Sequence, residues 1–347
     1  MTLSSGGGVT APDGLGDLGR LAGLRAGGEL LFAGPLTGQL VEGGKSNLTY
    51  CITDGEHMWA LRRPPLGHVL PTAHDMAREY RLLSALAPTD VPVPEPVLLC
   101  DDPDVIGTTF YLMAWVDGTV YRTLAETATL SGDEAADLAD QMMAVLARLH
   151  SLDPADVGLD DFGRPAGFLE RQVRRWGKQL AASRSRPLPG IDELHDRLAR
   201  SVPESPEPAI VHGDYRLDNT IIGADGSIAA VVDWEMTTVG DPLTDLGLLD
   251  VYWDGLAAMS SSVSSAVGPA SPFPRFAALI EAYQKRRAVD LSALPWYVAL
   301  GYFKLAVINE GIHVRYTQGQ TVGAGFEHIG DYTISLIELG HAALQEN

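Results

Sequence analysis

The chain has 347 residues, an apolar content of 46% and a formal net charge of −20, a composition that predicts a globular protein with a sizeable core. The acidic balance argues against nucleic acid as a partner, because nucleic-acid-binding proteins present a basic stripe to phosphates. No apolar run approaches the ~20 residues that span a bilayer, so no membrane partner is expected.

The first residues are rich in Gly and Ser and lack the basic and apolar regions of a secretory signal. Two cysteines are too few for a disulfide framework or a metal cluster, so we expect a cytoplasmic protein. The acidic residues are spread along the whole chain. The charge therefore indicates mainly solubility, and it favours a polycationic substrate only mildly.

Residues 1–25 are expected to form a flexible tail because they are rich in Gly. Residues 26–116 are expected to form a strand-rich lobe. Residues 75–86 carry apolar side chains at helical spacing and predict one helix within that lobe. Short apolar runs predict five strands, at 36–41, 48–52, 58–62, 97–100 and 110–114.

Residues 117–347 are expected to form a second, mainly helical lobe. Residues 260–274 are low in complexity and predict a mobile loop, which is a candidate lid over a substrate bound in this lobe. The predicted architecture is α+β and bilobal, with a small antiparallel sheet and one helix followed by helices. The helices are predicted from periodicity at 134–149, 167–180, 192–201, 242–252, 275–287, 296–316 and 327–345.

The most specific signal is the run Val-His-Gly-Asp-Tyr-Arg-Leu-Asp-Asn at residues 211–219, followed fourteen residues later by a further Asp. Kinase-type phosphoryl transfer uses an Asp as base, an Asn five residues on, and an Asp after the next strands to hold Mg²⁺. Asp214, Asn219 and Asp233 have this spacing. The alternative is that they are turn residues, which Asp, Asn and Gly favour, but one such cause would have to explain several spacings at once.

Apolar runs at 209–211, 220–222 and 228–232, with a turn signal at 224–227, surround these residues. They predict a strand end, a catalytic loop and a β-hairpin. Asp214 then lies in the loop, and Asp233 follows the last strand.

The segment 42–47 joins two predicted strands and contains paired glycines, Gly43 and Gly44. Their backbone N–H groups can approach phosphates closely, and Ser46 and Asn47 would add side-chain donors. The segment lacks the glycine spacing of a Walker loop. A simple hairpin turn is the alternative.

Arg62 ends the run Trp-Ala-Leu-Arg, where a kinase-type fold places the lysine of its third strand. Arginine binds phosphate oxygens in a bidentate manner, unlike the point charge of lysine. Glu79 in the predicted helix is its expected partner. Two alternatives remain: an ordinary surface ion pair, and an inactive nucleotide-binding module that has lost the lysine.

Several acidic and imidazole groups are expected to be structural. Asp241 or Asp245 would cap the helix that follows, His150 ends a helix, and His212 would order the catalytic loop by hydrogen bonding. A metal-hydrolase site built from His212, Asp214, Asp218 and Asp233 is the competing interpretation. It lacks a second histidine at ligand spacing, and Asn with Asp suits Mg²⁺ shared with phosphates.

Together these motifs resemble the aminoglycoside phosphotransferase-like family, which shares the protein-kinase fold. The resemblance covers nearly the whole chain after residue 25. It is strongest to the branch that includes the kinase-like domain fused to acyl-CoA dehydrogenases, where an arginine at the position of Arg62 looks usual. The segments that carry it are GGKSNLTY, ALRRPP, AHDMAREYRLL, PVPEPV, YLMAWVDG, VHGDYRLDN and VVDWEMTTVGDPLTDLG.

The resemblance implies a bilobal fold, ATP or GTP as donor, Mg²⁺, and phosphorylation of a hydroxyl group on a small molecule. It makes Asp214 the base and makes Asn219 and Asp233 the metal ligands. It also implies a hinge that meets the purine, formed by Met113, Ala114, Trp115 and Val116.

Three features favour a small-molecule kinase over a protein kinase. Gly213 replaces the arginine that pairs with a phosphorylated loop, Trp234 and Glu235 replace Phe-Gly, and helical sequence resumes by 242. The leading hypothesis is a small-molecule phosphotransferase, and the alternative is a catalytically silent nucleotide-binding module.

The acceptor stays open at this point. The family name suggests aminoglycosides, whereas the most similar branch suggests hydroxyacyl-CoA or hydroxy acids. Lys304 and Arg315 lie in a late helix and would suit an anionic acceptor.

Overall fold

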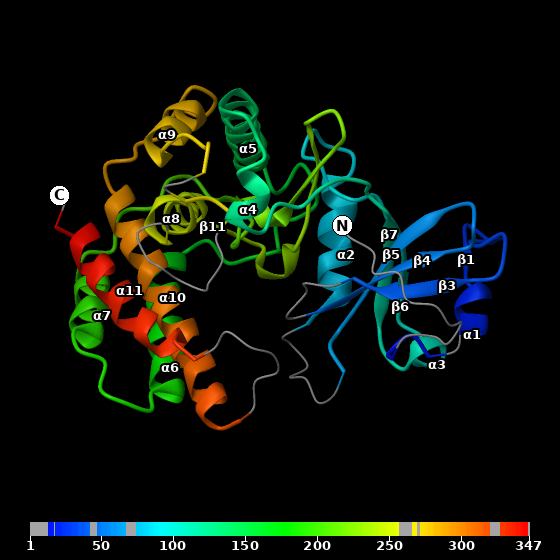
Figure 1. The fold of residues 1–347 in the computed structure, drawn as a ribbon, viewed down its shortest axis with the longest axis horizontal. Helices are drawn as coiled ribbons and strands as arrows, with labels where there is room; N and C mark the ends of the chain where they lie inside the picture. The colour runs from blue at the N-terminus through cyan, green and yellow to red at the C-terminus, as the bar shows by residue number, and fades with distance from the viewer. Residues whose placement is uncertain are drawn as a thin grey trace. The chain divides into compact units, whose positions relative to one another are not determined.

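The computed structural model describes residues 13–16, 18–41, 47–66, 74–256, 266–268, 271–319 and 327–345. The chain divides into two compact units (Figure 1). The first contains Met1–Val120 and Thr220–Glu235, and the second contains Tyr121–Asn219 and Met236–Asn347.

A five-stranded antiparallel sheet forms the centre of the first unit, in the order β3-β4-β5-β7-β6. All five strands were predicted, and helix α2 (Met76–Leu86) packs on β6 and β7 as the single predicted helix of the sheet. Asp75 caps α2 by accepting the N–H of Arg78. The strands are β3 (Thr37–Leu40), β4 (Leu48–Thr53), β5 (Met58–Arg63), β6 (Pro96–Cys100) and β7 (Phe110–Ala114).

The described part of residues 1–25, which the sequence predicts as a flexible tail, contains regular structure and buried side chains. Leu18–Ala22 forms helix α1, and Leu15 and Leu21 are fully buried in the same apolar core as Leu61. Burial of these leucines, which the glycine-rich composition concealed, holds the segment in place. Three further short elements lie in this unit: β1 (Arg25–Ala26), β2 (Glu29–Leu30) and α3 (Pro103–Ile106).

The predicted hairpin around the second acid is present as β9 (Thr220–Ile222) and β10 (Ile228–Val231). It belongs to the first unit, because Thr119 bridges Ile222 and the N–H of Val231 donates to the carbonyl of Pro92 at 2.8 Å. Gly118 makes this approach possible, since a Cβ there would lie 2.5 Å from the Ile222 oxygen. The predicted division after residue 116 therefore differs from the observed one.

Helices dominate the second unit. Helix α10 (Leu294–Thr317) packs against α6, α8 and α11 (Figure 1), and its apolar residues occur on all sides, as expected for a buried helix. The remaining helices are α4 (Leu124–Thr127), α5 (Gly132–Ser151), α6 (Phe168–Ser183), α7 (Ile191–Arg200), α8 (Leu243–Asp250), α9 (Phe276–Gln284) and α11 (Ile329–Ala343). Within the described ranges, no helix is long and apolar enough to cross a bilayer.

Strand β8 (Ala209–Val211) leads into residues 212–219, the predicted catalytic loop, and pairs with β11 (Thr238–Gly240), a short strand that the sequence did not predict. The loop ends in the 3₁₀ turn η1 (Leu217–Asn219). A second 3₁₀ turn, η2 (Trp234–Met236), follows Asp233, and the π-helical turn η3 (Val251–Gly255) extends α8.

The predicted lid at 260–274 lies largely outside the described residues. Its described parts are attached to neighbours: Thr127 donates to the carbonyl of Ala266 at 2.6 Å, and the Trp253 indole N–H donates to that of Pro274 at 2.9 Å.

Candidate active site

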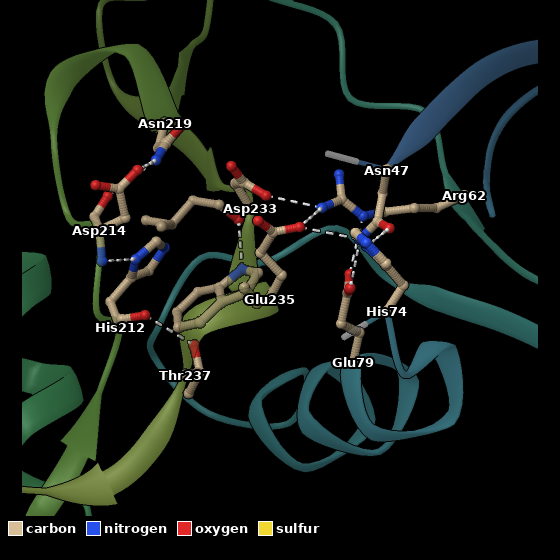
Figure 2. A network of polar contacts seen from close by, with 12 residues as sticks. Asn47, Arg62, His74, Glu79, His212, Asp214, Asn219, Asp233, Glu235 and Thr237 are labelled. Carbon is tan, nitrogen blue, oxygen red and sulfur yellow. Dashed lines mark hydrogen bonds and ion pairs between the residues drawn. The ribbon is translucent and has the colours of Figure 1, made fainter. Parts of the chain in front are cut away.

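Arg62 is the centre of a charged cluster in the first unit (Figure 2). Its Nε lies 2.9 Å from Glu79 Oε2, its Nη2 lies 2.7 Å from Asp233 Oδ1, and Glu235 Oε2 is 3.6 Å away. The Arg62 side chain is only 11% exposed, and Tyr111 donates a hydrogen bond to Glu79 at 3.0 Å. This arrangement is a buried network with the predicted Glu79 pair at its core, and not a surface ion pair.

The electrostatics of the cluster reflect burial and three acidic neighbours. Burial opposes the charge of Arg62, but Tyr111, Glu79 and Asp233 outweigh it and raise the pKa of the guanidinium group. Burial also raises the pKa of the Glu79 carboxyl group, against the attraction of Arg62. Arg62 therefore stays charged, and its carboxylate partners compensate the cost of burying that charge.

Asn47 connects two carboxylates of the same cluster (Figure 2). Its Nδ2 donates to Glu79 Oε1 at 2.9 Å and to Glu235 Oε2 at 3.1 Å, and its Oδ1 lies 2.7 Å from His74 Nδ1. Both amide N–H groups are thus used, so donation to a phosphate would require one of these bonds to break. The other predicted phosphate contacts, Gly43, Gly44 and Ser46, lie outside the described residues.

Asp233 combines a strained backbone with an accessible carboxylate. Its φ angle is +66°, a left-handed conformation that no other described residue apart from glycine adopts. Its side chain is 37% exposed, which leaves a carboxylate oxygen free of the Arg62 contact. Strain of this kind persists only where the surroundings enforce it, and it concentrates at functional positions.

The predicted hinge runs from the end of β7 into the following segment. Ala114 N–H donates to the Glu95 carbonyl at 2.8 Å, and Trp115 N–H donates to that of Met58 at 3.3 Å. Met113 of β7 pairs with Ala60 of the neighbouring strand β5, and Val116 packs on the small apolar cluster of Val120, Ile221 and Ala230. These residues form a continuous connection along the end of the sheet.

Asp214 lies in the catalytic loop of the second unit, and Asn219 fixes it (Figure 2). The Nδ2 of Asn219 donates to the Asp214 carbonyl at 2.9 Å and to the Asp214 carboxylate at 3.2 Å. These bonds leave the Asn219 Oδ1 as an oxygen ligand, and amide and carboxylate oxygens are the ligands that Mg²⁺ prefers. The chemistry of Asn219 and Asp233 therefore fits the predicted ion.

A buried acid anchors the same loop. Asp245 accepts the backbone N–H of His212 at 2.8 Å and that of Gly213 at 2.7 Å. It also bonds His150 Nε2 at 3.1 Å, and His150 Nδ1 lies 2.8 Å from the Tyr283 hydroxyl. Because Asp245 is 0% exposed, these contacts make the loop part of the core.

The protonation of this anchor follows from burial and hydrogen bonding. Burial lowers the pKa of His150, so its neutral ring donates from Nε2 and accepts the Tyr283 hydroxyl at Nδ1. Burial opposes ionisation of Asp245, but the hydrogen bonds from His150 and from the Gly213 backbone lower its pKa. Asp245 is therefore a carboxylate that accepts three donors, a role larger than the helix cap predicted from sequence.

His212 does order the loop as predicted. It is fully buried, and its Nδ1 accepts the backbone N–H of Asp214 at 3.2 Å. Asp218 binds the Arg216 guanidinium through both oxygens. His212 and Asp218 are thus committed to other partners, which removes two ligands from the metal-hydrolase alternative. Among the residues that the structure describes, no three His, Cys, Asp or Glu side chains gather as a metal site.

Two further side chains, Tyr252 and Lys304, contact the loop; the sequence did not single out Tyr252, and it connected Lys304 with an anionic acceptor and not with the loop. Tyr252 hydrogen-bonds both Asp214 and Arg216, and burial raises its pKa. The guanidinium of Arg216 also lies over the Tyr252 ring, 4.3 Å from its centre. Lys304 donates to the carbonyl of Gly213 at 2.9 Å. No local motif marks these residues, because only folding brings them to the loop.

Comparison with known proteins identifies the family. Residues 37–266 match the model of the phosphotransferase enzyme family. Acyl-CoA dehydrogenase family member 11 of Rattus norvegicus is 36% identical over 282 residues, which cover 80% of this chain but only 36% of that protein. The aminoglycoside 3'-phosphotransferase of Escherichia coli is 25% identical over 154 residues, or 43% of this chain and 55% of that protein.

Solved structures agree with this assignment. A candidate aminoglycoside phosphotransferase of Ralstonia eutropha JMP134 has a TM-score of 0.79 and 31% identity, covering 91% of this chain and 94% of its own. Aminoglycoside phosphotransferase APH(4)-Ia, solved with ADP and hygromycin B, has a TM-score of 0.59 at 12% identity, covers 88% of this chain and 94% of its own, and shares the fold. The predicted α+β, kinase-like fold is confirmed, and the chain belongs to the phosphotransferase enzyme family.

Proposed function

We propose that this protein is a Mg²⁺-dependent phosphotransferase that moves the γ-phosphate of ATP or GTP to a hydroxyl group of a small molecule. The observation that carries the proposal is the fixation of Asp214. The backbone N–H of Gly213, in the same loop, donates a hydrogen bond to the buried Asp245. The Nδ2 of Asn219 donates to both the carbonyl and the carboxylate of Asp214. Holding one carboxylate in a fixed orientation suits a base that accepts the proton of an attacking hydroxyl.

Asn219 and Asp233 are assigned to the metal. When bound, Mg²⁺ neutralises charge on the nucleotide phosphates. The free amide oxygen of Asn219 and the accessible carboxylate of Asp233 support this assignment.

Arg62, oriented by Glu79, is assigned to the nucleotide phosphates together with Gly43, Gly44 and Ser46. A guanidinium group already held by carboxylates loses little freedom on binding a phosphate. Asn47 then acts by orienting Glu79 and Glu235. Met113, Ala114, Trp115 and Val116 are assigned to the purine. The buried free thiols of Cys51 and Cys100 fit a reducing cytoplasm.

For the acceptor we propose either an aminoglycoside-like compound or a hydroxyacyl-CoA or hydroxy acid. The E. coli relative is named as an aminoglycoside phosphotransferase, and the mammalian relatives are named as acyl-CoA dehydrogenase family members. A direct test offers MgATP with kanamycin or 3-hydroxybutyryl-CoA and measures ADP and the phosphorylated product. If neither these compounds nor a wider panel of hydroxyl compounds is phosphorylated, the result would argue for the silent nucleotide-binding alternative.

That alternative has one observation in its favour, because Arg62 in the lysine position binds Asp233 directly. Slow ATP hydrolysis with Mg²⁺ separates the two functions. We expect wild type to hydrolyse ATP and Asp214→Ala to lose that activity. Equal rates in both proteins would support the silent module.

A further inference from the structure

Lys304 places a charged group on a half-buried side chain of the second unit. It lies midway along α10, and its ammonium group is 5.7 Å from the centre of the Trp176 ring. The one hydrogen bond described for it goes to the carbonyl oxygen of Gly213, at 2.9 Å. A lysine is seldom buried without a partner, so this contact needs a reason beyond packing.

The groups that face Lys304 are Asp214 and Asp245 on the acidic side and Arg175 on the basic side. Burial lowers the pKa of the Lys304 ammonium group, and the two acids oppose that effect. A charged group between two acids is attracted to both of them. The two acids therefore offset part of the cost of burying the ammonium group.

The contacts around Asp214 define the orientation of its backbone. The carbonyl of Gly213 and the N–H of Asp214 belong to one planar peptide group. Lys304 binds the carbonyl of that group, and His212 Nδ1 accepts its N–H at 3.2 Å. On the other side of Asp214, Asn219 binds the next carbonyl at 2.9 Å. Side chains thus hold both peptide groups that flank Asp214.

Gly213 itself cannot supply this rigidity. Its φ angle is +85°, and a Cβ at this position would lie 2.8 Å from the Met236 carbonyl oxygen, so the position requires glycine. Glycine has more backbone conformational freedom than any other residue type. A flexible residue directly before the base makes an external restraint necessary.

We propose that Lys304 is a positioning residue, whose ammonium group fixes the Gly213–Asp214 peptide so that the Asp214 carboxylate points at the acceptor hydroxyl. The inference deepens the proposed function and rests on it. Lys304 is assigned to the loop and not to the acceptor, because the hydrogen bond described for it goes to the Gly213 carbonyl.

The test compares Lys304→Met, which keeps the length and loses the charge, with Lys285→Met, which removes an exposed charge at the end of α9. Phosphate transfer from MgATP to kanamycin, 3-hydroxybutyryl-CoA or water is measured. We expect Lys304→Met to lower kcat about 10²-fold, the cost of a misplaced catalytic group, with both KM values nearly unchanged. Lys285→Met should match wild type.

Lys304→Ala extends the test, because small amines can enter the space left by the side chain. Methylammonium or ethylammonium should restore part of kcat, and 1-propanol should not. A rise in the acceptor KM that exceeds the loss in kcat would make Lys304 an acceptor ligand and overturn the inference. Rescue by 1-propanol, or full activity of Lys304→Met, would also overturn it.

Hydrogen exchange separates this inference from the proposed function. The peptide covering residues 212–219 should exchange faster in Lys304→Met than in wild type and in Lys285→Met. Unchanged exchange would overturn the positioning role even if the enzyme proves active. Faster exchange in a protein that transfers no phosphate would refute the proposed function and leave the Lys304 restraint on the loop intact.

Discussion

The two acids of the proposed site are held in different ways. Asp233 meets the charged side chain of Arg62, which also binds Glu79 and lies near Glu235. Asp214 lies in a loop whose backbone groups bond the buried Asp245, Lys304 and Asn219. Carboxylates that share one guanidinium group can exchange partners with a charged ligand, whereas a backbone group that loses its hydrogen bond is left unsatisfied at a cost of about 1–3 kcal/mol. The Arg62 cluster is therefore suited to binding a changing ligand, and the loop is suited to keeping one geometry.

The largest effect is expected at the base. Asp214→Asn keeps the shape of the side chain but removes the group that accepts a proton, so turnover should fall by about 10²–10⁴-fold. Steady-state kinetics and nucleotide binding measure the two halves of the prediction. Affinity for MgATP should stay near that of wild type, and retention of more than half of the wild-type rate would remove Asp214 from the role of base.

Loss of the anchor should affect stability more than nucleotide binding. Asp245→Ala leaves two buried backbone N–H groups and His150 without their acceptor. The free energy of unfolding should fall by roughly 3–5 kcal/mol, the cost of breaking a buried polar pair. Urea denaturation measures it, with Asp290→Ala as control, because exposed Asp290 also accepts a backbone N–H. Equal stability of the two variants would contradict the anchoring role.

Arg62→Ala should weaken nucleotide binding by about 10- to 100-fold, because a hydrogen bond to a charged group contributes about 1.5–3 kcal/mol. Arg62→Lys should keep part of the affinity, because the charge remains while the bidentate geometry is lost. Arg63 is a matched comparison, since it bonds the backbone carbonyls of Pro64 and Ile106. Arg63→Ala should lower stability and leave nucleotide affinity unchanged; identical kinetics in Arg62→Ala and wild type would refute the phosphate role.

Asp233→Ala should weaken nucleotide binding by about tenfold, or ~1.4 kcal/mol, and only when Mg²⁺ is present. The carboxylate is assigned to the ion and not to the phosphates, so titrations with EDTA should give similar affinities for variant and wild type. Isothermal titration with and without Mg²⁺ measures the difference. A variant that loses affinity equally under both conditions would exclude Asp233 as a metal ligand.

The smallest expected effect is a loss of stability at acidic pH. His150 has a lowered pKa because it is buried, so its contribution to stability is complete above the ordinary value of 6.5 and is lost as pH falls below it. The free energy of unfolding should decrease by up to about 1.4 kcal/mol per pH unit in that range. His150→Gln cannot titrate and should show a flatter profile between pH 7 and 5. Parallel profiles would mean that other groups cause the acid sensitivity.

How far the sequence predicts this molecule depends on the separation of the residues involved. Asp214 and Asn219 lie five residues apart, so local spacing revealed them together. The pairing of Arg62 with Glu79 was expected because the run Trp-Ala-Leu-Arg stands where a kinase-type fold places its third-strand lysine, whose partner lies on the following helix. The five-stranded sheet and the long helices followed from apolar runs.

The contacts that sequence reasoning missed join residues that lie far apart in the chain. His150 contacts an acid 95 residues away, and Lys304 contacts a carbonyl 91 residues away, with no motif in either neighbourhood. Strand β11 has three residues and exists because β8 pairs with it. Leu15 and Leu21 lie in a glycine-rich stretch whose composition suggested disorder, but both are buried in the core, and Leu18, Ala22 and Leu24 pack against it.

The hairpin of β9 and β10 has a consequence for synthesis of the chain on the ribosome. It completes the first unit, yet Asp233 follows Arg62 by 171 residues. At about 5–20 residues per second, Arg62 leaves the ribosome roughly 10 to 35 seconds before Asp233, one of its carboxylate partners, is synthesised. During that interval the cation of the nascent sheet lacks this carboxylate, and Pro92 and Thr119 lack their hydrogen-bond partners in the hairpin. A fragment that stops at residue 120 would remain in that condition permanently, so the unit cannot be excised as one continuous piece of the gene.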